Sequence, residues 1–443
     1  MITLLDYGAG NIRSVVNAVR HLGFEVRMVQ SPEEIVSAER LIFPGVGNFG
    51  QVMSALHDRG YIEPLFRRIS EDRPILGICV ALQTLFAASE ESPGIAGLAV
   101  IPGTIKKFCG NFAVPQMGWN GLKVYKKHPV LNGYSGQRLY FVHSYYAEIT
   151  RENKDWLLTG TDYGGEFISG VSRGNLTAFQ FHPEKSGQAG LALLHNFLAA
   201  SKDEQLEIST KNIKTQIAKR VIACLDVRTN DAGDLVVTKG DQYEVREQGE
   251  VRNYGKPVAI ARRYYEEGAD EITFLNITGF RDFPIQDQPM LEVLRRTSEK
   301  VFVPLTVGGG IRAFTDAAGR FYSALEVASV YFRSGADKVS IGSEAVAAAQ
   351  EYLASGGRLS GGSAIEQISR AYGNQAVVIS VDPRRVYVQS PDDTGHAVIE
   401  TNYPGPDGER YCWYQCTVKG GREGRDIDVV QLAAACEKMG AGE

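Results

Sequence analysis

Short apolar runs alternate with helix-like segments along most of this 443-residue chain. In the first half, such runs occupy residues 2–6, 25–29 and 41–43, and a helical pattern at 12–22 separates the first two. This alternation predicts a mostly parallel, doubly wound α/β sheet. Because ligands of such sheets bind where the strands end, functional residues are expected at the carboxyl ends of these runs.

A fourth apolar run, residues 74–78, ends at Cys79, and residues 80–89 are expected to form a helix. This order predicts the strand–turn–helix layout of a nucleophile elbow, with Gly77 relieving crowding at the tight turn. A thiol at a helix N-terminus faces unpaired N–H groups and the positive end of the helix dipole, which favours the thiolate. The alternative is a buried core cysteine, the commoner fate of a cysteine beside a strand.

Two further segments favour the nucleophile. Residues 44–50 follow the third run and are glycine-rich, so backbone N–H groups near Gly47 could form an oxyanion hole. His182 and Glu184 stand two apart at a later strand end, a spacing that places two side chains on one face of a strand. A carboxylate that orients an imidazole, which in turn activates a thiol, has the logic of a catalytic triad. The alternatives are an ordinary turn and a surface His–Glu pair.

Composition limits the class of protein. Hydrophobic residues make up 44% and charged residues 22%, as in globular enzymes, and the length allows two or three domains. The net charge is −5 and no basic block occurs, so neither nucleic acid nor a membrane is expected as a partner. The chain begins directly with a strand, so we expect a cytoplasmic protein, or a plastid one if a transit peptide is missing from this sequence.

The cysteines give no sign of a disulfide scaffold or a metal site. Six of them are scattered along the chain, which suggests a reducing compartment. Cys412 and Cys416 form a C-x₃-C pair without a nearby histidine or second pair, so no metal site is expected.

A new βα series follows a polar stretch at residues 201–216. Apolar runs at 221–227, 271–278, 301–307, 338–341 and 376–381, with a helical pattern at 257–267, predict a (β/α)₈ barrel. The expected domains are therefore 1–200, a linker at 201–216 and a barrel from 217 to 443.

An internal repeat marks two strand ends of the barrel. Asp226 and Asp382 each end an apolar run, with an arginine two residues beyond. Two such carboxylates could act as a general acid/base pair, although each alone could also cap a helix. The glycines at 308–310, and Gly342 with Ser343, offer N–H groups and a hydroxyl suited to a phosphate.

Residues 1 to about 200 resemble class I glutamine amidotransferases. The motifs that carry this resemblance are Pro44-Gly-Val-Gly47, Gly77-Ile-Cys79-Val-Ala-Leu-Gln83 and Phe181-His-Pro-Glu-Lys-Ser186. Val114-Pro-Gln-Met-Gly-Trp-Asn120 and Tyr140-Phe-Val-His-Ser-Tyr145 resemble the branch that serves histidine biosynthesis. One departure is Ala81, where the family usually has glycine, and the extra methyl group predicts a small packing cost without loss of chemistry.

The resemblance implies roles for individual residues. Cys79 would be the nucleophile, His182 the base and Glu184 the group that orients the base. The residues expected around the bound glutamine are Val46 and Gly47 at the oxyanion hole, with Gln83, His143, Ser144 and Tyr145.

The second half resembles the cyclase of the imidazole glycerol phosphate synthase family. The matching motifs are Ala218-Lys-Arg-Val-Ile-Ala-Cys-Leu-Asp226-Val, Leu305-Thr-Val-Gly-Gly-Gly-Ile-Arg312 and Gly335-Ala-Asp-Lys-Val-Ser340. Their order after a glutaminase and a linker is similar to the fused enzymes of fungi and plants. In that family, ammonia from glutamine crosses the barrel and converts a phosphoribulosyl-formimino carboxamide ribonucleotide to imidazole glycerol phosphate and aminoimidazole carboxamide ribonucleotide.

This second resemblance implies further roles, and no cofactor. Asp226 and Asp382 would be acid/base residues, with Lys239 near the substrate. One phosphate would lie at Gly309, Gly310, Gly342 and Ser343. The charged ring that gates ammonia entry would consist of Arg220, Glu271, Lys338 and Glu443. Asn276 receives no catalytic role, because many bacterial relatives have aspartate there.

Five βα units can be counted, whereas a closed barrel needs eight. An unclosed parallel sheet leaves strand edges without partners, so we expect a chain truncated at its C-terminus whose cyclase half folds poorly alone. The leading interpretation is a monomeric, bifunctional synthase that uses L-glutamine and a bis-phosphorylated, nucleotide-derived substrate. The alternatives are a chain with glutaminase activity only and an inactive fragment.

Overall fold

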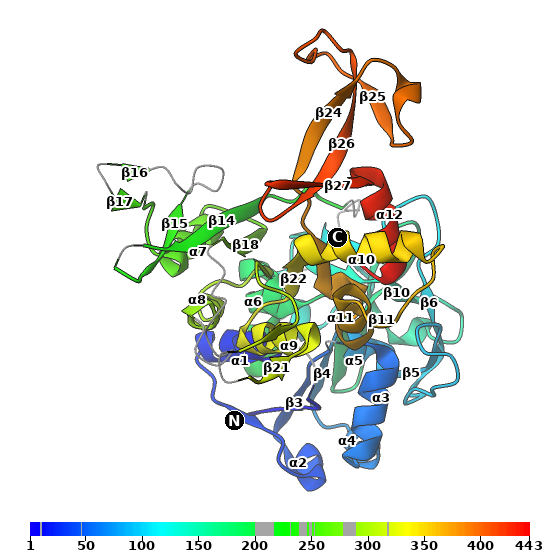
Figure 1. Cartoon of the computed structure of the whole chain (residues 1–443). Helices are drawn as coiled ribbons and strands as arrows, with labels where there is room; N and C mark the ends of the chain where they lie inside the picture. The colour runs from blue at the N-terminus through cyan, green and yellow to red at the C-terminus, as the bar shows by residue number, and fades with distance from the viewer. Residues whose placement is uncertain are drawn as a thin grey trace.

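Figure 1 shows the computed structural model of the whole chain. It describes residues 1–8, 11–45, 47–199, 217–230, 232–238, 246–247, 250–251, 253–277, 289–316 and 319–443. Val46, Lys239 and the expected linker at 201–216 lie outside the described residues.

The first half folds around one mixed sheet, whose parallel part has the order β2-β1-β3-β4-β13. These strands are β2 (Val26–Met28), β1 (Ile2–Leu4), β3 (Arg40–Phe43), β4 (Ile75–Ile78) and β13 (Leu176–Phe179). Successive side chains enter different cores: Leu41 and Phe43 pack on one side and Ile42 on the other. The sheet is therefore covered on both faces, and the predicted doubly wound class is confirmed.

Helices supply the two covering layers. On one side, α3 (Phe49–Asp58) and α4 (Ile62–Ser70) share a core with Leu41. On the other, α1 (Ile12–His21) and α6 (Gly187–Ala199) share a core with Ile42. The shorter helices of this half are α2 (Pro32–Ser37) and α5 (Val80–Thr84).

An antiparallel extension continues the sheet beyond β13, and a separate hairpin stands beside it. The extension consists of β12 (Glu166–Arg173), β10 (Tyr145–Glu148), β6 (Ile101–Lys107), β5 (Phe86–Ser89), β11 (Leu157–Asp162) and β8 (Lys123–Val124), in which β5 pairs parallel with β6. The hairpin pairs β7 (Gln116–Asn120) with β9 (Leu139–His143). The expectation of a helix up to residue 89 is wrong, because α5 ends at Thr84 and β5 follows.

The second half has a six-stranded sheet of order β15-β14-β18-β19-β22-β23, parallel except for β15. Its strands are β15 (Leu235–Thr238), β14 (Ile222–Thr229), β18 (Glu271–Asn276), β19 (Leu305–Gly308), β22 (Lys338–Ile341) and β23 (Val377–Ile379). The helices are α7 (Pro257–Glu266), α8 (Pro289–Ser298), α9 (Ala324–Ser334), α10 (Ser343–Ala354), α11 (Ala364–Tyr372) and α12 (Val429–Met439). Five parallel strands with helices between them agree with the predicted barrel-type domain.

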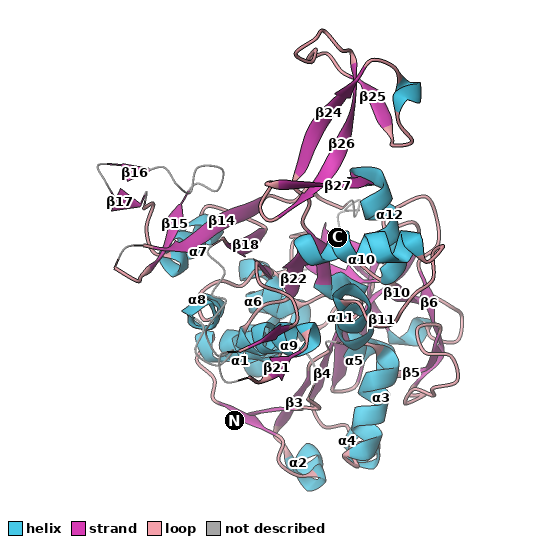
Figure 2. Ribbon diagram, viewed as in Figure 1, coloured by secondary structure: helices cyan, strands magenta, loops and turns pink. Residues whose placement is uncertain are grey.

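A four-stranded antiparallel sheet follows Asp382 and projects from the rest of the molecule (Figure 2). Its strands are β24 (Pro383–Val388), β25 (Val398–Glu400), β26 (Tyr411–Val418) and β27 (Glu423–Asp428). No strand beyond residue 381 is among those predicted from the sequence. Two small hairpins, β16 (Arg246–Glu247) with β17 (Glu250–Val251) and β20 (Phe314–Thr315) with β21 (Phe321–Tyr322), complete the described strands.

The two halves share a hydrophobic core. Trp119 on β7 and Tyr140 on β9 are buried in the same cluster as the strands of the second half. Backbone hydrogen bonds also cross, from Ala218 N to Trp119 O at 2.9 Å and from Gly187 N to Phe302 O at 3.0 Å. The β7–β9 pair thus packs against both halves: Leu139 and Phe141 lie in a core of the first half, whereas Trp119 and Tyr140 lie in the core of the second.

Candidate active site at the junction of the two halves

Cys79 occupies a strained turn between β4 and α5. Its φ of 53° and ψ of −110° lie in a region that residues other than glycine rarely adopt. Gly45 lies so close to this turn that a Cβ atom there would come within 1.8 Å of the Ile78 carbonyl oxygen. The predicted strand–turn–helix layout is present, although α5 is too short for much of the helix dipole invoked from the sequence.

His182 and Glu184 contact each other, but they do not share a strand face. His182 precedes the short 3₁₀ turn η3 (Pro183–Lys185), and its Nδ1 lies 2.8 Å from Glu184 Oε1. Pro183 sets the first position of that turn, so the chain curls and brings the carboxylate back to the ring. The pair that the sequence suggested therefore exists through a turn, and both side chains are buried.

The β9 strand holds this turn in place. His182 N donates to Tyr140 O at 2.9 Å, and Tyr140 N donates to Ser186 Oγ at 2.9 Å. Ser186 Oγ in turn donates to His182 O at 2.6 Å. These bonds close a loop between the His182 turn and β9, and they fix the position of the imidazole.

The charges around His182 favour its protonated form. Burial opposes a charge on the ring, but the negative charges of Cys79 and Glu184 outweigh burial and raise the pKa of His182 well above its usual value. Burial, aided by the charge of His182, lowers the pKa of His143 to about 3. His143 Nδ1 lies 2.7 Å from Tyr145 O, which can only accept, so the neutral ring carries its proton there.

Five of the residues expected around glutamine belong to the described part of the chain: Gly47, Gln83, His143, Ser144 and Tyr145. Gly47, with a φ of 122°, lines the same pocket as Cys79. Gln83 Nε2 donates to Tyr145 O at 2.9 Å, so the nitrogen of this amide is used inside the protein. Ser144 and Tyr145 are half-buried at the end of β9 and the start of β10.

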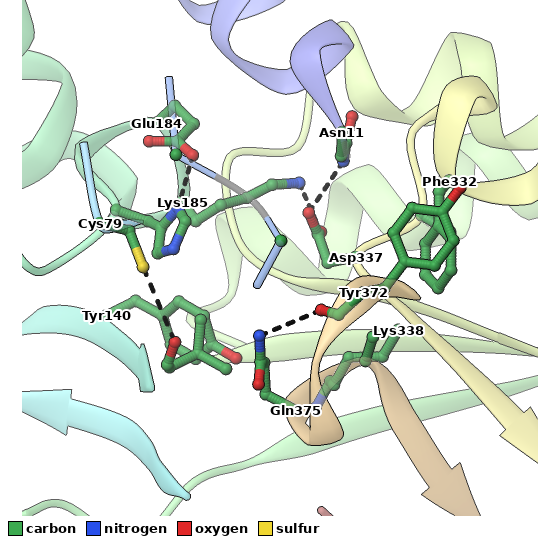
Figure 3. Close-up of a pocket in the computed structure, with 16 residues that line it drawn as sticks. Asn11, Cys79, Tyr140, Glu184, Lys185, Phe332, Asp337, Lys338, Tyr372 and Gln375 are labelled. Atoms are coloured by element: carbon green, nitrogen blue, oxygen red, sulfur yellow. Dashed lines mark hydrogen bonds and ion pairs between the residues drawn. The ribbon is translucent and has the colours of Figure 1, made fainter. Parts of the chain in front are cut away.

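A pocket opens from Cys79 towards the second half (Figure 3). The first half contributes Asn11, Gly45, Gly47, Cys79, Tyr140, Val142, His182, Glu184 and Lys185 to its lining. The second half contributes Phe332, Ala336, Asp337, Lys338, Tyr372, Gln375 and Ala376. The thiol and the strand start at Lys338 thus line one cavity between the halves.

Ion pairing across this pocket involves residues to which the sequence reading gave no role. Lys185 Nζ lies 2.6 Å from Asp337 Oδ2, and Asn11 Nδ2 donates to Asp337 Oδ1 at 2.8 Å (Figure 3). Leu305 N also donates to Asp337, at 2.8 Å. Lys185 and Asp337 stand inside quoted motifs, but their pairing is long-range and no local pattern reveals it.

The four residues of the expected charged ring do come together. Lys338 Nζ lies 2.6 Å from Glu271 Oε1 and 2.6 Å from Glu443 Oε2. Arg220 lies 3.1 Å from Glu271 and also pairs with Glu443. Lys338 and Glu271 are almost fully buried. Burial, together with the charge of Glu271, raises the pKa of the Tyr140 hydroxyl well above its usual value.

The described residues expected at the cyclase site lie at or beyond the carboxyl ends of the parallel strands in the second sheet. Strand pairing places Asp226, Leu275, Gly308, Ser340 and Val378 in one row. The carboxyl-terminal side of this row contains Gly309, Gly310, Gly342, Ser343 and Asp382. Asp226 and Asp382 belong to the two ends of the parallel array, with three strands between them. Ser343 Oγ accepts a hydrogen bond from Lys419 N at 3.1 Å, from the β26–β27 turn.

Within the described part of the chain, no group of three or more potential metal ligands occurs. Cys412 and Cys416 are free and buried on β26. Among the helices described, none is long and apolar enough to cross a membrane.

Two family models match the chain in the order of its two halves. Residues 3–200 match the class I glutamine amidotransferase model, and residues 220–443 match a model described as a histidine biosynthesis protein. The hisHF imidazole glycerol phosphate synthase of Arabidopsis thaliana, which is named as chloroplastic, is 59% identical over all of this chain and 75% of its own length. This chain belongs to the hisHF family of imidazole glycerol phosphate synthases.

Two fungal members agree. The hisHF proteins of Emericella nidulans and Schizosaccharomyces pombe are each 53% identical over the whole of this chain, which spans 83% and 84% of their lengths. The family and the class of enzyme predicted from the sequence are therefore confirmed: a glutamine amidotransferase domain precedes a histidine-biosynthesis domain of barrel type, and the chain is a bifunctional enzyme of histidine biosynthesis.

Proposed function

We propose that this chain hydrolyses L-glutamine at Cys79 and passes the ammonia to a cyclase site in its second half. There, a bis-phosphorylated phosphoribulosyl-formimino carboxamide ribonucleotide would be converted to imidazole glycerol phosphate and aminoimidazole carboxamide ribonucleotide. The names of the three hisHF relatives support this reaction. The observation that carries the proposal is the pocket that joins the buried Cys79–His182–Glu184 cluster to Lys338.

In the first step, the thiolate of Cys79 attacks the side-chain amide carbon of glutamine and forms a tetrahedral intermediate. Backbone N–H groups near Gly47, which lines the pocket beside Cys79, would stabilise the negative oxygen. His182 then gives its proton to the leaving nitrogen, so ammonia departs and a thioester remains. Glu184 keeps the ring oriented, and its charge stabilises the imidazolium that precedes this transfer.

In the second step, His182 takes a proton from water, which attacks the thioester and releases glutamate. His143 remains neutral, and its Nε2 is a buried acceptor that has no hydrogen-bond partner among the described residues. A polar group of glutamine could therefore bind there. This supports the placement of His143 beside the substrate.

Ammonia would leave through the pocket towards the Arg220–Glu271–Lys338–Glu443 ring. Neutral ammonia is small and can both donate and accept hydrogen bonds, whereas bulk water would protonate it. The ring closes the lower end of the strands with ion pairs. It would act as a gate, because moving Lys338 or Arg220 breaks pairs without unfolding a strand.

At the carboxyl ends of the strands, Asp226 and Asp382 would exchange protons with the substrate during ring formation. Gly309, Gly310, Gly342 and Ser343 would bind one phosphate through N–H groups and a hydroxyl. Lys239, proposed to lie near the substrate, is outside the described residues. The support is the strand register that brings the described members to one edge.

The domain limits 1–200, 201–216 and 217–443 also remain our proposal, as does a monomer that carries both activities. For the compartment, we propose the cytoplasm or a plastid. The plastid is supported by the chloroplastic name of the Arabidopsis relative.

The test replaces Cys79 with alanine. We expect glutamine consumption to fall to background, because no other thiol lines the pocket among the described residues. Any activity of the cyclase half with added ammonia should be unchanged. Cys109→Ala is the matched control, since this cysteine is free and exposed and does not line the pocket. Continued consumption of glutamine by the Cys79→Ala variant would overturn the assignment.

A further inference from the structure

Gln180, which stands between β13 and His182, brings its side-chain amide to the sulfur of Cys79. Its Nε2 lies 3.6 Å from Cys79 Sγ, and the residue is fully buried. The position is rigid, because Gln180 N also donates to Ser169 O at 2.9 Å. A buried amide at the reacting atom is therefore part of the site.

Two other hydrogen bonds decide which end of this amide faces the sulfur. Gln83 Nε2 donates to Tyr145 O at 2.9 Å and to Gln180 Oε1 at 3.1 Å. Since a backbone carbonyl can only accept, Gln83 must present its NH₂ group at this point. The oxygen of Gln180 is then held by that NH₂ group, and its nitrogen is left to face Sγ. Reversing the Gln180 amide would set two donors against each other.

Besides its interaction with the His182 ring, the sulfur has two contacts that favour different protonation states. Cys79 Sγ lies 3.9 Å from Val142 O, and only a thiol can donate a proton to that carbonyl. The N–H of Gln180 can donate to either state, and a hydrogen bond to a charged acceptor is the stronger one. Gln180 therefore opposes the preference that Val142 O creates for the neutral thiol.

We propose that Gln180 is a catalytic residue of the glutaminase site, which stabilises the thiolate of Cys79 and directs its free lone pair towards the substrate. The inference rests on the proposed role of Cys79 as the nucleophile. As the sulfur attacks, its negative charge passes to the substrate oxygen, and the bond from Gln180 weakens. Its benefit is therefore a larger thiolate fraction, which matters most at low pH.

Other titratable groups around the sulfur remain in place during the test. Those that line the same pocket are Tyr140, His182, Glu184, Lys185, Asp337, Lys338 and Tyr372. A change of the thiolate titration in a Gln180 variant can therefore be assigned to the amide.

The experiment measures the rate at which iodoacetamide alkylates Cys79 as a function of pH, resolved by mass spectrometry of the peptide. We expect the pH midpoint of Cys79 alkylation to rise by about one unit in Gln180→Met. Below the midpoint, this shift corresponds to a tenfold lower thiolate fraction. Gln180→Glu should shift it further, since a carboxylate can still accept from Gln83 but repels the thiolate. In turnover, kcat/KM for glutamine should fall at neutral pH, and the loss should shrink as pH rises.

Ser169→Ala is the matched control, because Ser169 is equally buried and its hydroxyl donates to Thr159 Oγ1, at 2.9 Å. Its midpoint should equal that of the wild type. If Gln180→Met does not fold, Gln83→Met decides, because it leaves Gln180 present but without its orienting partner, and the midpoint should again rise. An unchanged midpoint in the folded variant overturns the proposal. Alkylation needs no glutamine, so this result is independent of whether Cys79→Ala still consumes it.

Discussion

Replacing Gly45 with alanine tests whether the turn at Cys79 is held by close packing. The backbone of Gly45 has no positive φ, so alanine can adopt its conformation and the cost is entirely one of contact. The new Cβ would lie 1.8 Å from Ile78 O, 2.6 Å from Val80 N and 2.7 Å from Ala81 N, all backbone atoms. To reach 3.0 Å, the turn has to move by roughly 1.2 Å. A displacement of about 1 Å at a reacting group costs about 100-fold in rate.

We therefore expect kcat/KM for glutamate release by Gly45→Ala to fall about 100-fold or more, with a loss of stability of about 1–3 kcal/mol from overpacking. Glutamate release and thermal unfolding are measured on the same preparation. Gly395→Ala is the matched control, because Gly395 also lacks a positive φ and has nothing within 4 Å of an added Cβ. If folded Gly45→Ala releases glutamate within twofold of the wild type, packing at Gly45 does not hold the nucleophile in place.

Two more predictions concern buried charges. Because the pKa of His182 is raised in the fold, its contribution to stability is complete below its ordinary pKa of about 6.5 and is lost as pH rises through the folded-state value. Glu184→Gln removes part of this stabilisation of the charged His182 ring. The thermal unfolding midpoint of the variant should therefore lie furthest below that of the wild type near pH 6, and the difference should be smallest at alkaline pH. A difference that grows with pH would contradict this reasoning. Lys338→Met leaves two facing carboxylates with less compensation, so urea unfolding should show a loss of about 3–5 kcal/mol. Adding Glu271→Gln to it should restore part of that loss, and strictly additive effects would argue against coupling in the ring.

Much of the site could be predicted because its residues follow local patterns. An apolar run before Cys79 and glycines after β3 are readable from neighbours in sequence. His182 and Glu184 were paired correctly, but on the wrong local structure, because Pro183 starts a 3₁₀ turn where a strand was expected. The end of α5 at Thr84 could not be read, since β5 exists through pairing with a segment near Ile101.

The sequence did not predict the Lys185–Asp337 pair, which depends on a long-range contact. It also did not lead us to β24–β27, although their segment has a strand-like pattern. Nothing near Lys185 or Asp337 announces that they meet across the two halves. By contrast, β24 to β27 had a readable pattern. Val386 and Val388 alternate with other residues, and the β-prone segment from Tyr411 leads to the Gly420-Gly421 pair, which suits a hairpin turn.

The shared core at the β7–β9 hairpin has a consequence for how this gene could be divided. If the chain were cut between the halves, Trp119 and Tyr140 would become part of an exposed apolar face, and so would the strand ends that cover them. Two separate polypeptides would then have to find each other through that face. Fusion reduces the entropy cost of that encounter, because one continuous chain keeps the two halves at high effective concentration. On β9, Tyr140 lies in this face, and two residues later Val142 O contacts the sulfur of Cys79. A loosened interface would therefore also change the surroundings of the thiol.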